Sequence, residues 1–403
     1  MLVFGRDAAM LRLPWKYKDD RKFDTETLRK NDISLLILDE RWNKLFSNVQ
    51  KPPFIVRSEE KLKELLKEAM GSGAFGMSTG LIYDPGIFAD THELIELSKV
   101  VAQYGGLYVT HMRNESDLLI ESVLEAIKIG KDSGARVEIS HHKASGKKNW
   151  GLVKTTLSLM EYYRRFGVEV TCDVYPCVYC QTGLHDCFPN WIRGNDFLEK
   201  LKDDAVKERL RKELSHPSVE FENIILDSGF DGIIIGSSAK FKQYQGKTVA
   251  EVSKLLGKDP LDTIFYLVEN DVNISVMTGG MNEDDVIYIM KNGLSMICSD
   301  SEVMKLGQGM PHPRGYRAFT RFLSTYVRDE SIMSLQEAIR KITSMPAWKL
   351  GIPDRGLLKP GFKADIAIFD YWELNYRSDY GDPHHYSEGM VYVLNNGKPI
   401  IMD

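Results

Sequence analysis

Two short apolar runs, each ending at a histidine, constrain the fold of this chain most. Residues 105–111 read Gly-Gly-Leu-Tyr-Val-Thr-His, and residues 136–141 read Arg-Val-Glu-Ile-Ser-His. Between them, apolar residues recur at three- and four-residue spacing, and residues 131–134 close that stretch. The pattern predicts a strand, a helix and a second strand, with the helix as the crossover that neighbouring parallel strands need. We therefore expect an α/β fold.

Three polar residues stand where predicted strands end. His111 and His141 end the two runs above, and Asp300 ends a run at 294–300. Side chains at the carboxyl ends of parallel strands converge at one end of an α/β barrel. Imidazole and carboxylate groups bind zinc, and zinc lowers the pKa of bound water. Any one strand-end histidine is more often an ordinary core or surface residue, so the combination is what indicates a hydrolytic metal site.

Strands and helices continue to alternate along the chain. Thr91 is the predicted N-cap of a helix, and a further helix is expected at 152–165, before a strand at 168–176. The region 180–265 breaks the alternation and is interpreted as an insertion, with strands expected at 219–226 and 232–236. The predicted domains are an atypical segment at 1–56, a barrel at 57–345 that contains this insertion, and a helix end with a small β-domain at 346–403.

The composition argues against two kinds of binding partner, nucleic acids and membranes. The net charge of −5 argues against nucleic acid, and no apolar run is long enough for a membrane span. The five cysteines are an odd number in a chain of 403 residues, which favours a reducing, cytoplasmic setting over a disulfide scaffold. We therefore expect a small-molecule substrate and a cytoplasmic protein.

Several segments resemble the N-acyl-D-amino-acid deacylases of the amidohydrolase superfamily. They occur in the order found in that family, at 73–86, 110–115, 140–144, 173–176, 299–301, 311–315 and 354–365. The resemblance implies a TIM-like (β/α)8 amidohydrolase barrel with a small C-terminal β appendage. It also implies zinc-dependent hydrolysis of the amide bond of an N-acyl-D-amino acid, which gives a D-amino acid and a carboxylate.

The resemblance also implies roles for individual residues. His111 and His141 match zinc-ligand positions, and Asp300 matches the catalytic aspartate. The substrate carboxylate would be held at the positions of Lys143, Tyr175 and Arg314. These side chains suit that task, since ammonium and guanidinium groups pair with carboxylates and a phenol adds a hydrogen-bond donor.

The chain departs from the family at its beginning. The family's first barrel strand ends in His-x-His, and a later strand carries a metal-binding cysteine, but this sequence has no His-x-His motif and no cysteine before Cys172. The expected barrel is therefore incomplete on its N-terminal side. Its exposed strand edges would favour a homo-oligomer. The third metal ligand is expected to be Asp300 or a cysteine at 172–187, although ordinary buried thiols are the favoured interpretation of those cysteines.

Two alternatives stay open at this point. One is a cyclic amidohydrolase such as a dihydroorotase or hydantoinase, although the Pro-His-Pro-Arg-Gly segment at 311–315 favours an acyclic acid. The other is an inactive, shortened relative that lacks the full metal site. Zinc content would separate this second alternative from the enzyme.

Overall fold

The fold is known from a computed structural model, which describes residues 59–402 except 195 and 219. The predicted N-terminal segment 1–56 lies outside the described residues. Contacts divide the chain into two units. Of the described residues, the first comprises 59–113, Ile120–Ser140 and Ser158–Cys172, and the second comprises Asn114–Leu119, His141–Leu157 and 173–402.

The first unit contains strands that alternate with helices, as the sequence predicts. Its elements in chain order are α3 (Glu59–Gly71), β1 (Gly76–Gly80), α4 (Thr91–Gln103), β2 (Leu107–His111), α5 (Leu119–Ser133), β3 (Arg136–Ile139), α6 (Leu152–Arg165) and β4 (Val170–Val174), some of which extend into the second unit. The pairs β1–β2, β2–β3 and β3–β4 are parallel. All residues of β2 and β4 are buried, as expected for parallel strands covered on both faces. The predicted strand–helix–strand unit is thus confirmed.

One predicted helix cap is wrong by a single residue. The N-cap of α4 is Asp90 rather than Thr91, because the Asp90 carboxylate accepts a hydrogen bond from the Glu93 amide at 2.8 Å. Aspartate and threonine both suit an N-cap, so residue type alone does not choose between neighbours.

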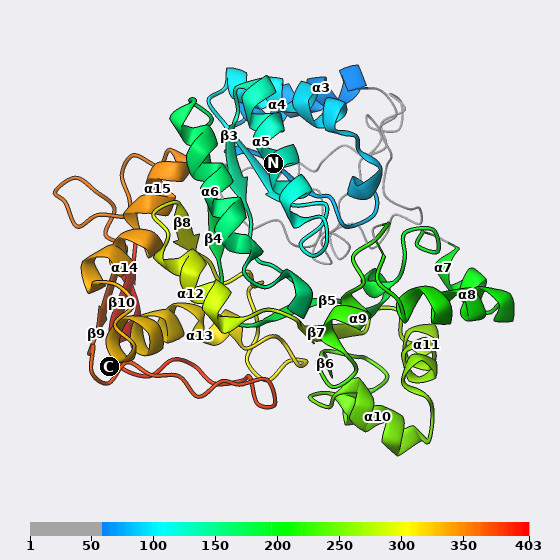
Figure 1. The fold of residues 1–403 in the computed structure, drawn as a ribbon. Coiled ribbons are helices and arrows are strands. Elements are labelled where there is room, and N and C mark those ends of the chain that lie inside the picture. The colour runs from blue at the N-terminus through cyan, green and yellow to red at the C-terminus, as the bar shows by residue number, and fades with distance from the viewer. Residues whose placement is uncertain (1–58, 195, 219, 403) are drawn as a thin grey trace, which may run out of the picture. The chain divides into compact units, whose positions relative to one another are not determined.

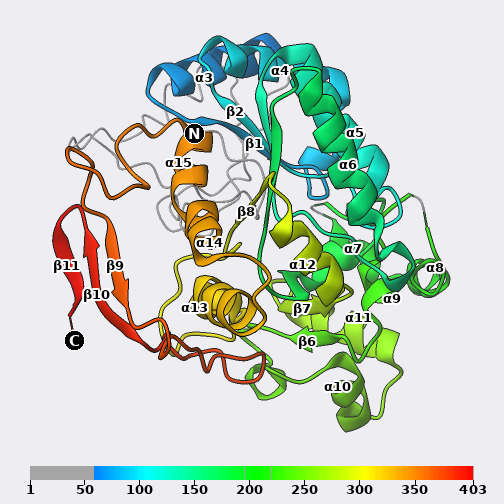
Figure 2. The ribbon, with the colours of Figure 1, turned by 60° about the vertical axis from the view of Figure 1, so that its left-hand side comes forward.

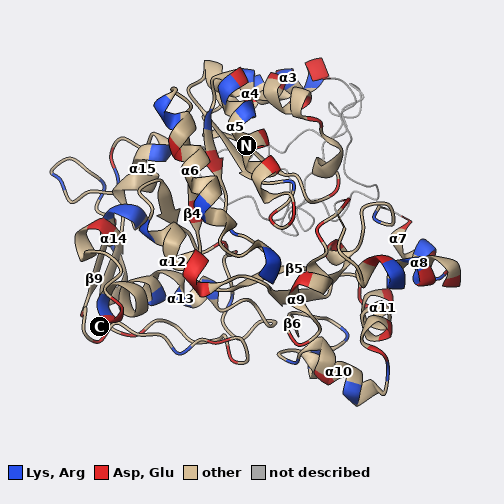
Figure 3. Cartoon of the chain, viewed as in Figure 1, with Lys and Arg blue, Asp and Glu red and all other residues tan. Residues whose placement is uncertain are grey.

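The second unit contains an antiparallel sheet with a hydrophobic core of its own. Strand β7 (Ser275–Gly279) lies between β5 (Tyr179–Gly183) and β6 (Ile233–Ile235). Around this sheet are α7 (Phe197–Leu201), α8 (Asp204–Leu214), α9 (Ile224–Ser228), α10 (Val249–Leu256) and α11 (Pro260–Asn270) (Figure 1). The three strands carry no Lys, Arg, Asp or Glu, whereas the surrounding helices do (Figure 3).

The strand predicted at 219–226 is wrong, since α9 begins within that range. The Asn223 side chain accepts a hydrogen bond from the Leu226 amide and so caps α9. Ile224, Ile225 and Leu226, which were expected in that strand, instead begin a short helix. By contrast, the predicted strand at 232–236 is confirmed as β6.

The remainder of the second unit contains strand β8 and the helices around it. The elements are α12 (Glu283–Lys291), β8 (Ser295–Ile297), α13 (Arg314–Arg321), the π-helical turn η5 (Phe322–Asp329), α14 (Leu335–Ile342) and α15 (Ser344–Leu350). Strand β8 follows β4 in the order β1-β2-β3-β4-β8. Buried Lys341 of α14 donates to the Asn292 and Ser295 carbonyls, which fixes the start of β8.

A three-stranded antiparallel sheet forms the C-terminal appendage. Its order is β11 (Lys398–Met402), β10 (Met390–Asn395) and β9 (Ile366–Phe369). The sheet lies beside α13 and α14 (Figures 1 and 2). The small β appendage predicted near the C-terminus is therefore present. Among the described residues, no helix has both the length and the apolar character needed to cross a membrane.

Candidate active site

Two residues of the site have a backbone conformation that is unusual outside glycine. His141 has φ of 40° and follows β3, and Asp300 has φ of 44° and follows β8. A positive φ strains residues other than glycine and is frequent at functional sites. The His141 amide donates to the Asp173 carboxylate at 2.8 Å, and this contact holds the strained turn. The sharp turns therefore place both side chains just past the ends of their strands.

Glu115 connects His141 and Lys143. Its two carboxylate oxygens lie 3.1 Å from His141 Nδ1 and 2.6 Å from Lys143 Nζ. All three side chains are buried. Burial opposes the charge on Lys143, but the Glu115 carboxylate outweighs it and raises the pKa of the lysine. Lys143 is therefore an ammonium ion held by a carboxylate rather than a surface lysine.

The same cluster sets the charge of His141. Burial and the Lys143 charge lower its pKa, but the carboxylates of Asp300 and Glu115 raise it more, so the net shift is upward. His141 Nδ1 also lies 2.8 Å from Lys143 Nζ. In the neutral ring, Nδ1 either donates to Glu115 or accepts from Lys143. Donation to Glu115 puts the ring's lone pair on Nε2, which is the arrangement found for histidines that bind metals.

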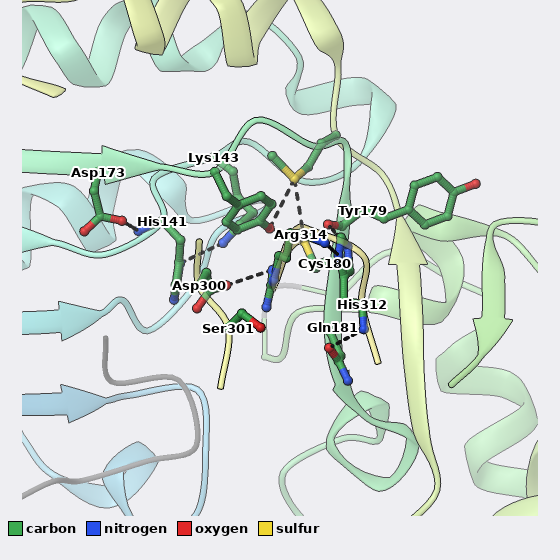
Figure 4. A network of polar contacts seen from close by, with 12 residues as sticks. His141, Lys143, Asp173, Tyr179, Cys180, Gln181, Asp300, Ser301, His312 and Arg314 are labelled. Carbon is green, nitrogen blue, oxygen red and sulfur yellow. Dashed lines mark hydrogen bonds and ion pairs between the residues drawn. The ribbon is translucent and has the colours of Figure 1, made fainter. Parts of the chain in front are cut away.

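Asp300 forms an ion pair with Arg314. Asp300 Oδ2 lies 2.8 Å from Arg314 NH1, and the two side chains are 12% and 4% exposed. Figure 4 shows Asp300 between His141 and Arg314. The predicted base and the predicted carboxylate anchor thus contact each other directly.

Tyr175 packs against both cationic residues of the predicted anchor. Its ring centre lies 4.5 Å from the Arg314 guanidinium carbon and 5.7 Å from Lys143 Nζ. Its hydroxyl donates to the sulfurs of Cys180 and Met281, at 3.1 and 3.4 Å. Burial raises the pKa of Tyr175 well above its usual value, so the phenol stays protonated. The three predicted anchor residues therefore form one cluster.

His312 supports Arg314 through the backbone. Its Nδ1 accepts from the Arg314 amide at 3.0 Å, and its Nε2 donates to the Tyr179 carbonyl at 2.9 Å. The His312 amide in turn donates to Gln181 Oε1 (Figure 4). Burial and the charge of Arg314 lower the pKa of His312 well below its usual value, so the ring is neutral. The sequence alone favours a structural role for His312, in the Pro-His-Pro segment, over one in lining the site.

His111, Glu115 and His141 have side chains of the types that bind zinc, and all three are buried. Two histidines and a carboxylate are one of the donor sets of catalytic zinc sites, so the residues fit zinc. Neither Asp300 nor a cysteine, the expected third ligands, belongs to this group. Of the five cysteines, Cys172, Cys177 and Cys187 are buried, and Cys180 and Cys298 are partly buried.

Sequence reasoning missed the roles of Glu115 and Asp173. Both lie in segments that resemble the family, and Glu115 follows His111 by four residues. That spacing was the available signal, but it applies to a helix and here the two residues are separated by the end of a strand. Only the positions of the loops bring the Glu115 carboxylate to His141.

Known proteins with similar sequences include several deacylases. The sequence profile of the amidohydrolase family matches residues 232–401. The N-acyl-D-glutamate deacylase of Alcaligenes xylosoxydans xylosoxydans is 30% identical over 341 residues, which are 85% of this chain and 61% of that protein. The D-aminoacylase of the same organism is 30% identical over 84% of this chain and 60% of that protein. The chain is a homologue of the N-acyl-D-amino-acid deacylases.

A crystal structure of a deacylase has the same fold. The N-acyl-D-glutamate deacylase of Bordetella bronchiseptica, complexed with zinc and a phosphonate inhibitor, aligns with a TM-score of 0.70 at 30% identity. The alignment covers 85% of this chain and 63% of that one. The predicted TIM-like amidohydrolase fold class is therefore confirmed for this deacylase homologue. The chain spans about three fifths of the length of the relatives it matches.

Proposed function

We propose that this deacylase homologue hydrolyses the amide bond of N-acyl-D-amino acids with the help of zinc. One observation carries the proposal most directly. In the second unit, a carboxylate orients a buried histidine, while the Asp300–Arg314 pair lies close by (Figure 4). This arrangement suits a site that must activate water and bind an anionic substrate. The relationship to deacylases over most of the chain supports the same conclusion.

His111 and His141 are the residues that would hold the zinc ion, and the Glu115 carboxylate would orient the His141 ring. When bound, zinc would polarise the acyl carbonyl and lower the pKa of water. Asp300 would take the proton from that water and pass it to the departing nitrogen. Asp300 suits this task because it is a carboxylate in a buried cluster, 12% exposed and close to His141.

Arg314, Lys143 and Tyr175 would bind the carboxylate of the substrate. Arg314 can hold a planar carboxylate with two parallel hydrogen bonds, and Lys143 supplies a second positive charge. The Tyr175 ring packs on Arg314 and limits the directions in which the guanidinium can point. Asp300 is an ion-pair partner of Arg314. A bound substrate carboxylate would compete for Arg314 and release Asp300 to act as the base.

We also propose the domain limits, location and assembly of the protein. The domain limits of 57–345 and 346–403, with an insertion at 180–265, agree in outline with the separate hydrophobic core around β5–β7. The odd number of cysteines, five in 403 residues, favours a cytoplasmic location. The exposed edge strand β11 favours a homo-oligomer.

Zinc content and substrate turnover test the proposed function together. Purified protein should contain about one zinc ion per chain, and the double variant His111→Ala/His141→Ala should lose it. A matched control is His92→Ala/His216→Ala, since both of these histidines are exposed. The wild type should hydrolyse N-acetyl-D-glutamate, N-acetyl-D-aspartate or N-acetyl-D-leucine in preference to the L-enantiomers. Zinc at the same level in both double variants, or no turnover of any of these substrates by zinc-loaded protein, would refute the proposal.

A further inference from the structure

Residues 114–117, here called the Glu115 loop, are held by two acidic residues far away in the sequence. We propose that Glu222 and Asp227 are positioning residues that fix the Glu115 loop, so that the Glu115 carboxylate can reach His141 and Lys143. The inference rests on the proposed function in one respect, because that function requires the Glu115 carboxylate to orient His141. The contacts that support it lie wholly within the second unit.

The first contact is made to the backbone of Glu115 itself. The Glu115 amide donates to Glu222 Oε2 at 2.7 Å, and the Glu115 carbonyl accepts from the Ser145 amide at 2.8 Å. Both polar groups of this peptide unit are therefore bound to residues outside the loop. Because Glu115 and Glu222 are both buried, water cannot readily replace a lost partner.

The second contact holds the next residue of the loop. The Ser116 hydroxyl donates to Asp227 Oδ2 at 2.7 Å and accepts from Asn149 Nδ2 at 3.0 Å. A Cβ atom placed on Gly146 would lie 2.6 Å from Asp227 Oδ1, so Asp227 packs directly against the glycine backbone. Asp227 thus fits between the Glu115 loop and the segment that follows Lys143.

The two acidic residues stand on a rigid support. Asn223 caps α9 and also donates from Nδ2 to the carbonyls of Glu213, Leu214 and His216. Neighbouring Phe221 and Ile225 are buried in the hydrophobic core of this part of the chain. Glu222 and Asp227 therefore lie at the edge of a packed core, and their carboxylates project from it to the Glu115 loop.

The contacts from Glu222 and Asp227 give the region around α9 a role in the site, because they hold the Glu115 loop. The Glu115 carboxylate bridges His141 and Lys143 only while its own backbone is fixed, because a loop residue has no strand or helix to hold it. Partners of metal ligands set ligand orientation, and their loss typically weakens metal affinity by about 10-fold to 100-fold. Glu222 and Asp227 would act one step further out, through the backbone and the neighbouring serine.

The test compares Glu222→Ala, Glu222→Gln and Asp227→Ala with the control Glu220→Ala. Glu220 is exposed and lies two residues from Glu222. Hydrogen exchange should be about tenfold faster in the peptide that covers residues 112–119 of Glu222→Ala and Asp227→Ala, since a buried hydrogen bond is lost. Peptides from the α8–α11 core should exchange as in the wild type. Glu222→Gln should restore slow exchange, because the amide oxygen can accept the same hydrogen bond.

Zinc affinity is the second measurement. Glu222→Ala should bind zinc at least about tenfold more weakly than Glu220→Ala, and Glu222→Gln should recover most of that loss. Unchanged exchange at residues 112–119 in Glu222→Ala would overturn the inference. So would faster exchange throughout the α8–α11 core, which would mean that the substitution only damages folding. If the wild type binds no zinc, the proposed function fails, whereas the exchange measurement still decides whether Glu222 and Asp227 hold the loop.

Discussion

The Asp300–Arg314 ion pair should make a large contribution to the free energy of unfolding, and replacing Arg314 by Met tests this. The paired atoms lie 2.8 Å apart and both side chains are largely buried. With an effective dielectric constant of about 20, two unit charges at that distance attract by about 6 kcal/mol before desolvation is subtracted. Removing one partner of a buried pair typically costs about 3–5 kcal/mol, because the other charge is left buried and unpaired. Arg314→Met should therefore reduce the free energy of unfolding by about that amount.

A double-mutant cycle separates the pair from its surroundings. The free energy of unfolding in urea is measured for the wild type, Arg314→Met, Asp300→Asn and the double variant. The double variant should be more stable than the sum of the single effects predicts, by at least about 2 kcal/mol. An exposed pair provides the control. Lys202 and Glu199 lie 2.8 Å apart on the surface, and the cycle Lys202→Met/Glu199→Gln should give a coupling of about 1 kcal/mol or less.

The same variants test how the pair relates to substrate binding. If a substrate carboxylate takes the place of Asp300 on Arg314, Arg314→Met should raise KM for N-acyl-D-amino acids, and Asp300→Asn should mainly lower kcat. A coupling energy below about 0.5 kcal/mol would refute the reasoning, since it would mean that the two charges act independently.

Three further substitutions probe other parts of the chain. Asp271→Asn should cost about 1–3 kcal/mol at pH 7, because Asp271 accepts from the Ser238 hydroxyl and the Ala239 amide. Burial opposes the charge on Asp271, but these hydrogen bonds outweigh it and lower the pKa of Asp271. The contribution of Asp271 to stability is therefore present above about pH 4 and is lost as the pH falls further. A stability difference between the wild type and Asp271→Asn that grows below about pH 4 would contradict this. Lys341→Met should cost about 2–4 kcal/mol in urea unfolding, because the carbonyls of Asn292 and Ser295 lose their donor, and an unchanged midpoint would show that water replaces it. His312→Ala should raise KM about tenfold with a smaller change in kcat, because the Arg314 amide loses its acceptor, and steady-state kinetics showing the reverse split would count against that role.

The sequence by itself determined the repeating architecture of the first unit. Apolar runs that end at His111 and His141, with a helix between them, predict parallel strands and a crossover, and both are present. Local signals suffice here because the side-chain period differs between strands and helices. The motif around Arg314 similarly predicted a cationic residue at the site, and it lies there beside Asp300 and Tyr175. The catalytic and binding roles of these residues stay predictions.

Short apolar segments were less well determined. The stretch 219–226 contains the residue types of a strand, yet Asn223 starts α9 there. An asparagine cap needs only one local hydrogen bond, whereas a strand needs a partner strand. Strand β7 already pairs with β5 on one side and with β6 on the other, so it has no free edge for the segment at 219–226.

Tertiary structure alone decided how the charged residues are paired. Glu115 belongs to a recognisable motif, but its contacts with His141 and Lys143 depend on loops that Glu222 and Asp227 help to hold. Asp300 and Arg314 were predicted to have separate tasks, and the fold joins them in one ion pair. Sequence spacing fixes which residues lie at the ends of strands. It does not fix the direction of a loop side chain, because that depends on hydrogen bonds from residues a hundred positions away.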